Sequence, residues 1–276
     1  MGRAGDPAPN LRLLPRAPVP PAGAAPETED GASAPTATAD AHLARGEEAR
    51  ERGEYPRAQE ELEQARALFE KDRDWEGYVR AGNLIGAVAN RQGDYKAALE
   101  HLNAALATAK EKLGPSHRGV AHSYQEIGKV YVSTGQSAEA LEFLGKALSL
   151  RRAAGGEPAE EVADILMRMA FARTNLGEDD QALALLDEAE ALQRKVLGRV
   201  QPRLADILIG KGGALWGQGK FDSAIAALEQ AIAMLEAEGG AHGSSLATAY
   251  LNLANAYWSK SDYDEALTFY GKALPL

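Results

Sequence analysis

The feature that most constrains this chain is a glycine that returns at a nearly fixed interval along most of its length. Five such glycines are separated by 40, 42, 42 and 42 residues, and Ser261 stands where a sixth would fall, 42 residues later. A fixed period of this size indicates stacked supersecondary units rather than a single folded core. The five positions are Gly53, Gly93, Gly135, Gly177 and Gly219.

Two alanines and one large residue follow each of these positions in strict register. The first alanine comes five residues later and the second comes seven residues after that. Positions seven apart share one helix face, where small side chains let a neighbouring helix approach closely. The first alanines are Ala58, Ala98, Ala140, Ala182, Ala224 and Ala266; the second are Ala65, Ala105, Ala147, Ala189, Ala231 and Ala273; the large residues are Leu62, Leu102, Leu144, Leu186, Leu228 and Tyr270.

Another small residue lies seven positions before each turn glycine, on an earlier helix of the same unit. Glycine inside a helix costs about 0.5–1 kcal/mol relative to alanine, so these positions need a packing reason, and a close helix crossing supplies one. Each unit is therefore predicted to be a helical hairpin, and stacked hairpins share a continuous core. The small residues are Gly46, Gly86, Gly128, Ala170, Gly212 and Ala254.

The chain divides in composition near residue 40. Residues 1–39 hold 8 of the 13 prolines, and we expect them to form a disordered Pro/Ala-rich arm that serves as a linker, a docking tail or an inert extension. Residues 40–276 are expected to form an all-α solenoid of six helical hairpins. The expected units are 40–78, 79–120, 121–162, 163–204, 205–246 and 247–276.

Composition excludes several classes of function. The chain has no cysteine, which excludes disulfides and thiol chemistry, and its formal net charge of −10 disfavours nucleic acid as a partner. No apolar run is long enough to span a membrane, and no apolar stretch follows the N-terminal arginines as it would in a secretory signal. A cytoplasmic protein without membrane contact is the default expectation.

The repeat resembles the tetratricopeptide repeat. Residues 253–257 (Leu-Ala-Asn-Ala-Tyr), 262–266 (Asp-Tyr-Asp-Glu-Ala) and 272–274 (Lys-Ala-Leu) meet its pattern closely. The longer period of 42, and the turn at residues 113–118 (Leu-Gly-Pro-Ser-His-Arg), are similar to kinesin light chains and to many bacterial multi-repeat proteins. HEAT repeats share the period but lack this register. The resemblance implies a right-handed superhelix whose first helices line a concave groove that binds peptides or helical segments of other proteins.

Mapped by this resemblance, the groove has two chemically different halves. The first half carries amides and cations, which suit a partner's backbone and carboxylates. The second half carries apolar side chains, among them two tryptophans at equivalent places in adjacent units, which suit anchoring contacts. The first set is Arg80, Asn83, Asn90, Arg91, His122, Gln125 and Lys129, and the second is Met167, Phe171, Ile209, Trp216, Leu251, Asn255 and Trp258. Each set also has an interpretation without a binding role. The first set can simply be a solvated face, and the second can pack within the array.

Nothing in the sequence points to catalysis. The nearest pair of histidines, His117 and His122, lies five residues apart across a turn without a third metal ligand in step. The glycines follow the repeat and do not form a phosphate-binding loop. We therefore expect neither enzymatic activity nor a cofactor or metal. A second reading keeps the array as the regulatory or sensing part of a larger enzyme, of kinase or transcription-factor type, joined through the proline-rich arm.

A third reading concerns the last unit. The sequence stops at Leu276, within the second helix of the sixth hairpin. Repeat arrays normally end in a polar capping helix, without which Leu267, Tyr270 and Leu274 would face water. Either further chain follows, or this face allows end-on self-association through the C-terminal unit.

Overall fold

The computed structural model describes residues 38–154, 159–196, 202–238 and 242–276. The chain divides into two units, Met1–Thr36 and Ala37–Leu276, and the second contains all of these residues. The predicted N-terminal arm lies outside the described residues except at its last two positions.

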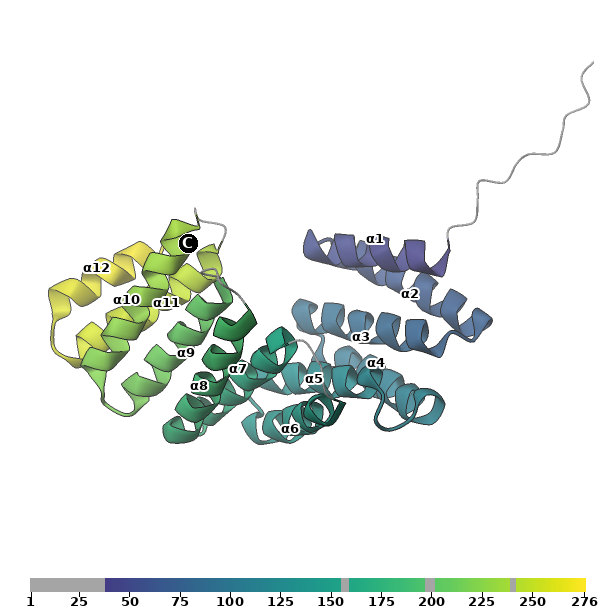
Figure 1. Ribbon diagram of the computed structural model, residues 1–276. Coiled ribbons are helices and arrows are strands. Elements are labelled where there is room, and N and C mark those ends of the chain that lie inside the picture. The colour runs from purple at the N-terminus through teal and green to yellow at the C-terminus, as the bar shows by residue number, and fades with distance from the viewer. Residues whose placement is uncertain (1–37, 155–158, 197–201, 239–241) are drawn as a thin grey trace, which may run out of the picture. The chain divides into compact units, whose positions relative to one another are not determined.

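Within the described residues the chain forms twelve α-helices and no strand, which confirms the predicted all-α class (Figure 1). The helices follow one another as six hairpins, and one π-helical turn, η1 (Ala109–Leu113), extends the fourth helix. The hairpins are α1 (Ala39–Glu51) with α2 (Tyr55–Asp72), α3 (Trp75–Gln92) with α4 (Tyr95–Thr108), α5 (Arg118–Ser133) with α6 (Ser137–Ala154), α7 (Ala159–Asn175) with α8 (Asp179–Val196), α9 (Pro202–Gly217) with α10 (Phe221–Ala237), and α11 (Gly243–Ser259) with α12 (Tyr263–Ala273).

The periodic glycine ends the first helix of each hairpin. All five adopt a left-handed conformation, with φ between 73° and 81°, which glycine reaches without the steric cost that a side chain brings. Ser261 takes the same conformation at φ 68° in the sixth unit. The period of the sequence is therefore the period of this helix-ending turn.

The crossing of the two helices in a hairpin is set by the small residue and the large one. A Cβ added at Gly128 on α5 would lie 2.6 Å from the Leu144 Cγ of α6, so the leucine side chain occupies the space that glycine leaves. The two alanine positions of the second helices are buried throughout, and their leucines are fully enclosed in the first five units. These three positions form the predicted core.

Stacking places the first helices on the inner side of the array. Each second helix packs against the first helix of the next unit, and successive first helices also contact one another, as α3 and α5 do. No two second helices of the described array come as close. The first helices therefore line the inner face, as expected of a helical-repeat superhelix (Figure 1).

The hairpins begin slightly before the expected unit boundaries. The second and third start at Trp75 and Arg118, where the expected units start at residues 79 and 121. The expected bounds follow the 42-residue spacing of the sequence. The helix start depends instead on side-chain capping, in which Asp74 accepts from the Gly77 amide and His117 accepts from the Gly119 amide.

Two glycines of the third unit give a matched test of this packing. Gly128→Leu should lower the free energy of unfolding by about 1–3 kcal/mol, because the new side chain overpacks the crossing at Leu144. Gly145→Leu on α6 should raise it by up to about 1 kcal/mol, because an added Cβ there meets nothing within 4 Å and helix propensity improves. Urea unfolding followed by circular dichroism measures both. Equal effects of the two changes would contradict the proposed crossing.

Candidate functional site

On the inner face, equivalent positions of the first helices recur at the 42-residue interval. One of these positions holds Asn83, Gln125, Met167, Ile209 and Leu251 in successive units. The next holds Lys129, Phe171 and Asn255 in units three, four and six, with Gly213 in unit five. Because the positions are equivalent in the stack, the residue type in each unit decides the chemistry of that stretch of the face.

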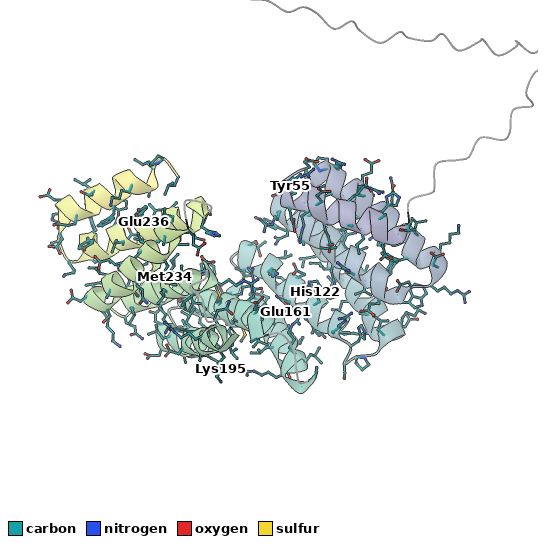
Figure 2. All side chains as sticks on the ribbon, turned by 45° about the horizontal axis from the view of Figure 1, so that its top comes forward. Tyr55, His122, Glu161, Lys195, Met234 and Glu236 are labelled. Carbon is teal, nitrogen blue, oxygen red and sulfur yellow. The ribbon has the colours of Figure 1, made fainter. Side chains whose placement is uncertain are left out.

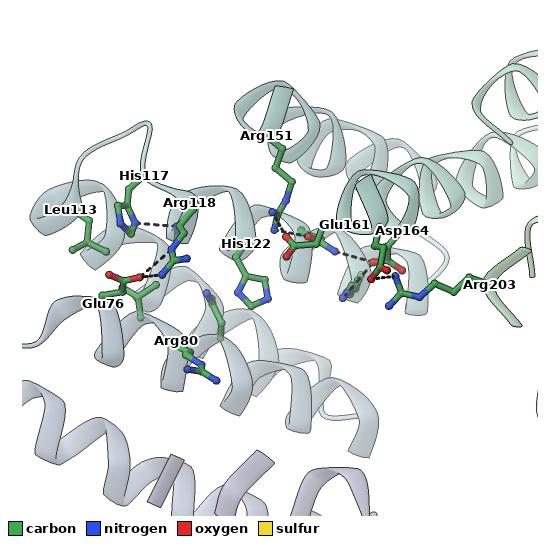
Figure 3. Close-up of a pocket in the computed structure, with 16 residues that line it drawn as sticks. Glu76, Arg80, Leu113, His117, Arg118, His122, Arg151, Glu161, Asp164 and Arg203 are labelled. Carbon is green, nitrogen blue, oxygen red and sulfur yellow. Dashed lines mark hydrogen bonds and ion pairs between the residues drawn. The ribbon is translucent and has the colours of Figure 1, made fainter. Parts of the chain in front are cut away.

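A groove of about 780 Å³ opens on the polar stretch of this face (Figure 3). We call it the polar groove. Helices α3, α5 and α7 form most of its wall, and single residues come from η1, α6 and α9. His122 of α5 and Glu161 of α7, from neighbouring first helices, are both labelled in Figure 2. The lining residues are Glu76, Val79, Arg80, Asn83, Leu113, His117, Arg118, Gly119, His122, Gln125, Lys129, Arg151, Glu160, Glu161, Asp164 and Arg203.

The amide of Asn83 is the most unusual group in the polar groove. The residue is only 1% exposed, its Oδ1 lies 2.8 Å from the Ser123 Oγ, and its Nδ2 has no hydrogen-bond partner in the structure. The Ser123 Oγ also lies 3.0 Å from the Gly119 carbonyl oxygen. A hydroxyl has one proton to donate. If it goes to Gly119, the Asn83 amide turns over to donate to Ser123, so in either orientation one edge of the amide lacks a partner.

The polar groove is balanced in charge, which differs from the cationic surface that the sequence suggests. Arg118 pairs with Glu76, and Arg151 pairs with Glu161 (Figure 3). Lys129 pairs with Glu126 at 2.7 Å. The remaining two cations of the lining are also paired, Arg80 with Glu47 and Arg203 with Glu160. The carboxylates come from other turns or other helices, so sequence position alone did not reveal these pairs.

A buried network lies beneath the groove at α5 and α7. Burial opposes the ionisation of Glu126, but the Lys129 ammonium and His122 outweigh it and hold the Glu126 pKa well below the ordinary value of 4.5. Burial likewise opposes ionisation of Asp164, and Arg168 and Lys129 lower its pKa. Gln125 donates to the Asp164 carboxylate at 2.8 Å and accepts from Arg151 at 3.2 Å. The network therefore fixes Gln125 and Lys129 in place.

The apolar stretch of the inner face lies on α7, α9 and α11. Phe171 and Trp216 are exposed, at 54% and 44%. The Trp216 indole donates to the Ser259 Oγ at 2.8 Å, which fixes its ring against the next unit. On α9, Gly213 stands in register with Phe171 and one turn before Trp216, and it leaves open space where a Cβ would stand. Trp258 is exposed and packs edge-to-face on Tyr263 with ring centroids 4.9 Å apart.

Several residues expected in the groove are buried in the core or make contacts outside the polar groove. Ile209 is buried and belongs to the core, and Met167 is half-buried against it, so packing explains both. Ile209 shares a cluster with Tyr250 and Leu253 of α11, and its part in a peptide groove stays a prediction. Leu251 is exposed because no described helix covers α11 in the same way.

The polar residues expected in the groove outside its lining have other surroundings. Asn255 accepts from the Tyr270 hydroxyl. Asn90 is half-buried and Arg91 exposed in the last turn of α3, outside the lining of the polar groove.

Sequence reasoning missed many lining residues of the polar groove, among them Arg151, Glu161 and Asp164, and it missed the buried Ser123, which is bonded to Asn83. Arg151 belongs to α6, a second helix, yet its side chain is 5% exposed and reaches Gln125 and Glu161. Its signal was available, because a charged residue stands where the units on either side have Ala109 and Gln193. Ser123 stands one repeat after Ala81, and Asp164 stands two repeats after Arg80. The positions of both therefore follow from the same periodicity.

Two further features of the described residues bear on the class of site. Among the described residues, no group of three or more histidines and carboxylates is placed to hold a metal ion. No helix of the described array is both long and apolar enough to cross a membrane.

Comparison with known proteins identifies the repeat. Residues 78–153 and 161–237 match one family model of the tetratricopeptide repeat, and residues 209–276 match a second. No curated protein matches the chain by sequence.

Solved structures share the fold at low sequence identity. BtubC (BKLC) from P. vanneervenii is 21% identical, with 86% of this chain and 90% of that chain covered, at a TM-score of 0.65. Nearly identical TPR-like repeats of a candidate kinesin light chain from Podosopora anserina are 22% identical over 71% and 93%, at 0.58. A Rap protein complexed with Competence and Sporulation Factor is 14% identical over 86% and 74%, at 0.62.

The network under the groove should make stability depend on pH. Glu126→Gln should lower the free energy of unfolding by about 1–3 kcal/mol at neutral pH, because a charged hydrogen bond to Lys129 is lost. A carboxyl whose pKa is depressed by folding contributes stability that disappears as pH falls. The difference between variant and parent should therefore shrink as pH drops below 4.5.

Urea unfolding at a series of pH values measures this, with Glu142→Gln as the control. Glu142 pairs with Lys146 on the exposed side of α6, so its loss should change stability little at any pH. A deficit of Glu126→Gln that stays constant down to strongly acidic pH would contradict the proposed role of the ionised carboxylate.

Proposed function

We propose that this chain, which belongs to the tetratricopeptide repeat family, is a protein-interaction scaffold that binds an extended segment of a partner protein along its inner face. The observation that carries the proposal is the buried Asn83 amide, which lines the polar groove with one edge unpaired. A buried amide without a partner costs about 1–3 kcal/mol. A peptide carbonyl or amide of the partner would recover that cost on binding.

The charges of the polar groove indicate which of them a partner can use. Arg80 and Glu47 form an exposed pair, and exposed pairs contribute little, so Arg80 can exchange Glu47 for a carboxylate of the partner. Arg151 is buried and pairs with the partly exposed Glu161, and separating that pair would take a carboxylate away from a buried guanidinium. The acidic part of the partner is therefore assigned to Arg80, with His122 beside it.

The apolar part of the partner is assigned to Phe171 and Trp216. Both rings are exposed on adjacent first helices, and the bond to Ser259 orders the Trp216 ring before any partner binds. The open space at Gly213 leaves room for a large apolar side chain between them. A preordered aromatic pair with a gap is the arrangement of a binding hot spot. Trp258 and Leu251 extend this surface on α11.

The same proposal covers location and chemistry. The scaffold works in the cytoplasm, catalyses no reaction and uses no cofactor. Its partner is a protein or peptide rather than nucleic acid or a membrane, in line with a net charge of −10. A Rap protein is known in complex with Competence and Sporulation Factor, which supports a binding role for an array of this fold.

Peptides selected from a random phage-displayed library on the parent protein test the groove. Asn83→Ala should weaken a selected peptide by about tenfold, the loss of one buried hydrogen bond, and Trp216→Ala should weaken peptides that carry a large apolar residue. Calorimetric titration gives the dissociation constants. Glu100→Ala, on the exposed side of α4, is the matched control and should leave binding unchanged. Selected peptides that bind all four proteins equally would contradict the groove as the site.

A second candidate function is self-association through the C-terminal unit. Leu267 and Leu274 of α12 are 64% and 86% exposed. Their equivalents one unit earlier, Ile225 and Ile232, are 8% exposed because α11 covers them. The last unit therefore presents to solvent the kind of surface that the fifth unit buries.

Sedimentation velocity over a range of concentrations tests self-association. The parent protein should become larger with concentration, and the double variant Leu267→Glu with Leu274→Glu should remain a monomer, because charges on the contact face oppose its burial. Circular dichroism should show the same helix content for both. A parent protein that stays monomeric at every concentration would exclude this candidate without touching the groove proposal.

A further inference from the structure

Two successive steps of the inner face carry equivalent positions with different residues. At the step from α5 to α7, Gln125 donates to Asp164 at 2.8 Å and accepts from Arg151 at 3.2 Å, so these three side chains form a closed network (Figure 3). At the next step, from α7 to α9, the residues one repeat later are Met167, Asp206 and Gln193. A methionine thus replaces the amide that joins the other two groups.

The carboxylate of Asp206 lacks every partner that its equivalent has. Asp164 is bonded to Gln125, Lys129 and Arg168. Side chains that cannot pair with a carboxylate stand one repeat after these three, namely Met167, Phe171 and Gly210. Asp206 is partly buried, and it makes no ion pair or side-chain hydrogen bond with any residue that the structure describes.

Two arginines near this step are bonded to other carboxylates. Arg203, one turn before Asp206 on α9, pairs with Glu160 at 3.4 Å. Arg168 on α7 places two nitrogens on the Asp164 carboxylate, at 3.1 Å each. A partly buried carboxylate without a counter-ion favours the binding of a cation, because its charge is otherwise uncompensated away from water.

The amide of Gln193 is the second unpaired group at this step. The residue is 2% exposed, and neither its Nε2 nor its Oε1 has a hydrogen-bond partner. Both orientations of the amide are therefore equally unsatisfied. The equivalent residues of the second and fifth units, Ala109 and Leu235, are buried apolar side chains. An apolar residue would thus be more stable here than a buried amide without a partner.

Building on the proposed binding of an extended partner segment, we propose that the step from α7 to α9 binds an arginine of that segment, with its guanidinium between the Asp206 carboxylate and the Gln193 Oε1. A guanidinium has five N–H donors in a planar fork, enough for a bidentate bond to the carboxylate and a third bond to the amide. Met167 stands between the two groups in the position of Gln125, and its flexible side chain can pack along the methylene stem of the arginine.

This assignment gives the inner face opposite charge preferences at two equivalent positions. Asp206 on α9 stands three repeats after Arg80 on α3. Arg80 is assigned an acidic residue of the partner, and Asp206 is now assigned a basic one. The partner segment is therefore bipolar, with its acidic part over α3 and its arginine over α9.

Arginine-containing peptides, selected from the random library on the parent protein, test this subsite by calorimetric titration. Replacing the arginine by citrulline, a neutral side chain of the same shape, should weaken binding to the parent by about tenfold, because charged hydrogen bonds are lost. Asp206→Asn should weaken the arginine peptide equally and leave the citrulline peptide unchanged. Asp222→Asn, at an exposed carboxylate of α10 that pairs with Lys260, is the matched control and should change neither affinity.

Gln193→Leu separates the binding role of the amide from a structural one. The variant should raise the urea midpoint of the free protein and weaken the arginine peptide by about fivefold, because a buried unpaired amide and one hydrogen bond to the peptide are removed together. A structural role would lower the urea midpoint instead. A variant that keeps full affinity would overturn the part assigned to Gln193.

The outcomes distinguish this subsite from the groove proposal. A citrulline effect in the parent that disappears in Asp206→Asn supports the arginine site. A citrulline effect of equal size in both proteins would overturn it, because the arginine would then be bound elsewhere, and so would selected peptides that all lack arginine. Either result leaves the groove proposal standing, since that proposal depends on Asn83→Ala. A parent protein that selects no peptide at all would overturn both.

Discussion

Everything else in this structure depends on the close crossing of the two helices within each hairpin. At Gly128 a single missing methyl group admits the Leu144 side chain of the opposite helix, and the same exchange of a small residue for a large one recurs in other units. Packed cores tolerate little change in volume at such a contact. The crossing therefore fixes the phase of the first helix against the second, and with it which side chains point inward.

Because that phase repeats, the function of the inner face becomes a matter of which residue occupies an equivalent position. The position of Asn83 is buried in most units, and an apolar residue such as Ile209 is the inexpensive choice for it. Units two and three instead carry Asn83 and Gln125 there, and the protein supports them with Ser123, Asp164 and Arg151. A buried polar network of this kind stabilises only when its members are paired. The unpaired edge of Asn83 is the exception that points to a ligand.

The sequence was sufficient for the repeat, the hairpins, the turn conformation and the core, because each follows from local sterics at a glycine or an alanine. The sequence was insufficient to predict which side chains at an equivalent position are exposed. Ile209 and Leu251 occupy the same register position, and only the presence or absence of a covering helix makes one buried and the other exposed. It was also insufficient to predict the ion pairs of the groove, since Arg118 and Arg151 pair with carboxylates of neighbouring units. Such pairings depend on the rise between units, which no single repeat encodes.

The central claim is that a partner peptide is held on the inner face by the Asn83 amide. Nuclear magnetic resonance titration with a library-selected peptide tests it most directly, through the side-chain amide signals of Asn83. We expect these signals to shift together with backbone signals of α3, α5 and α7, while those of α2 and α4 stay in place. A peptide that binds and leaves the Asn83 amide signals unmoved would contradict it.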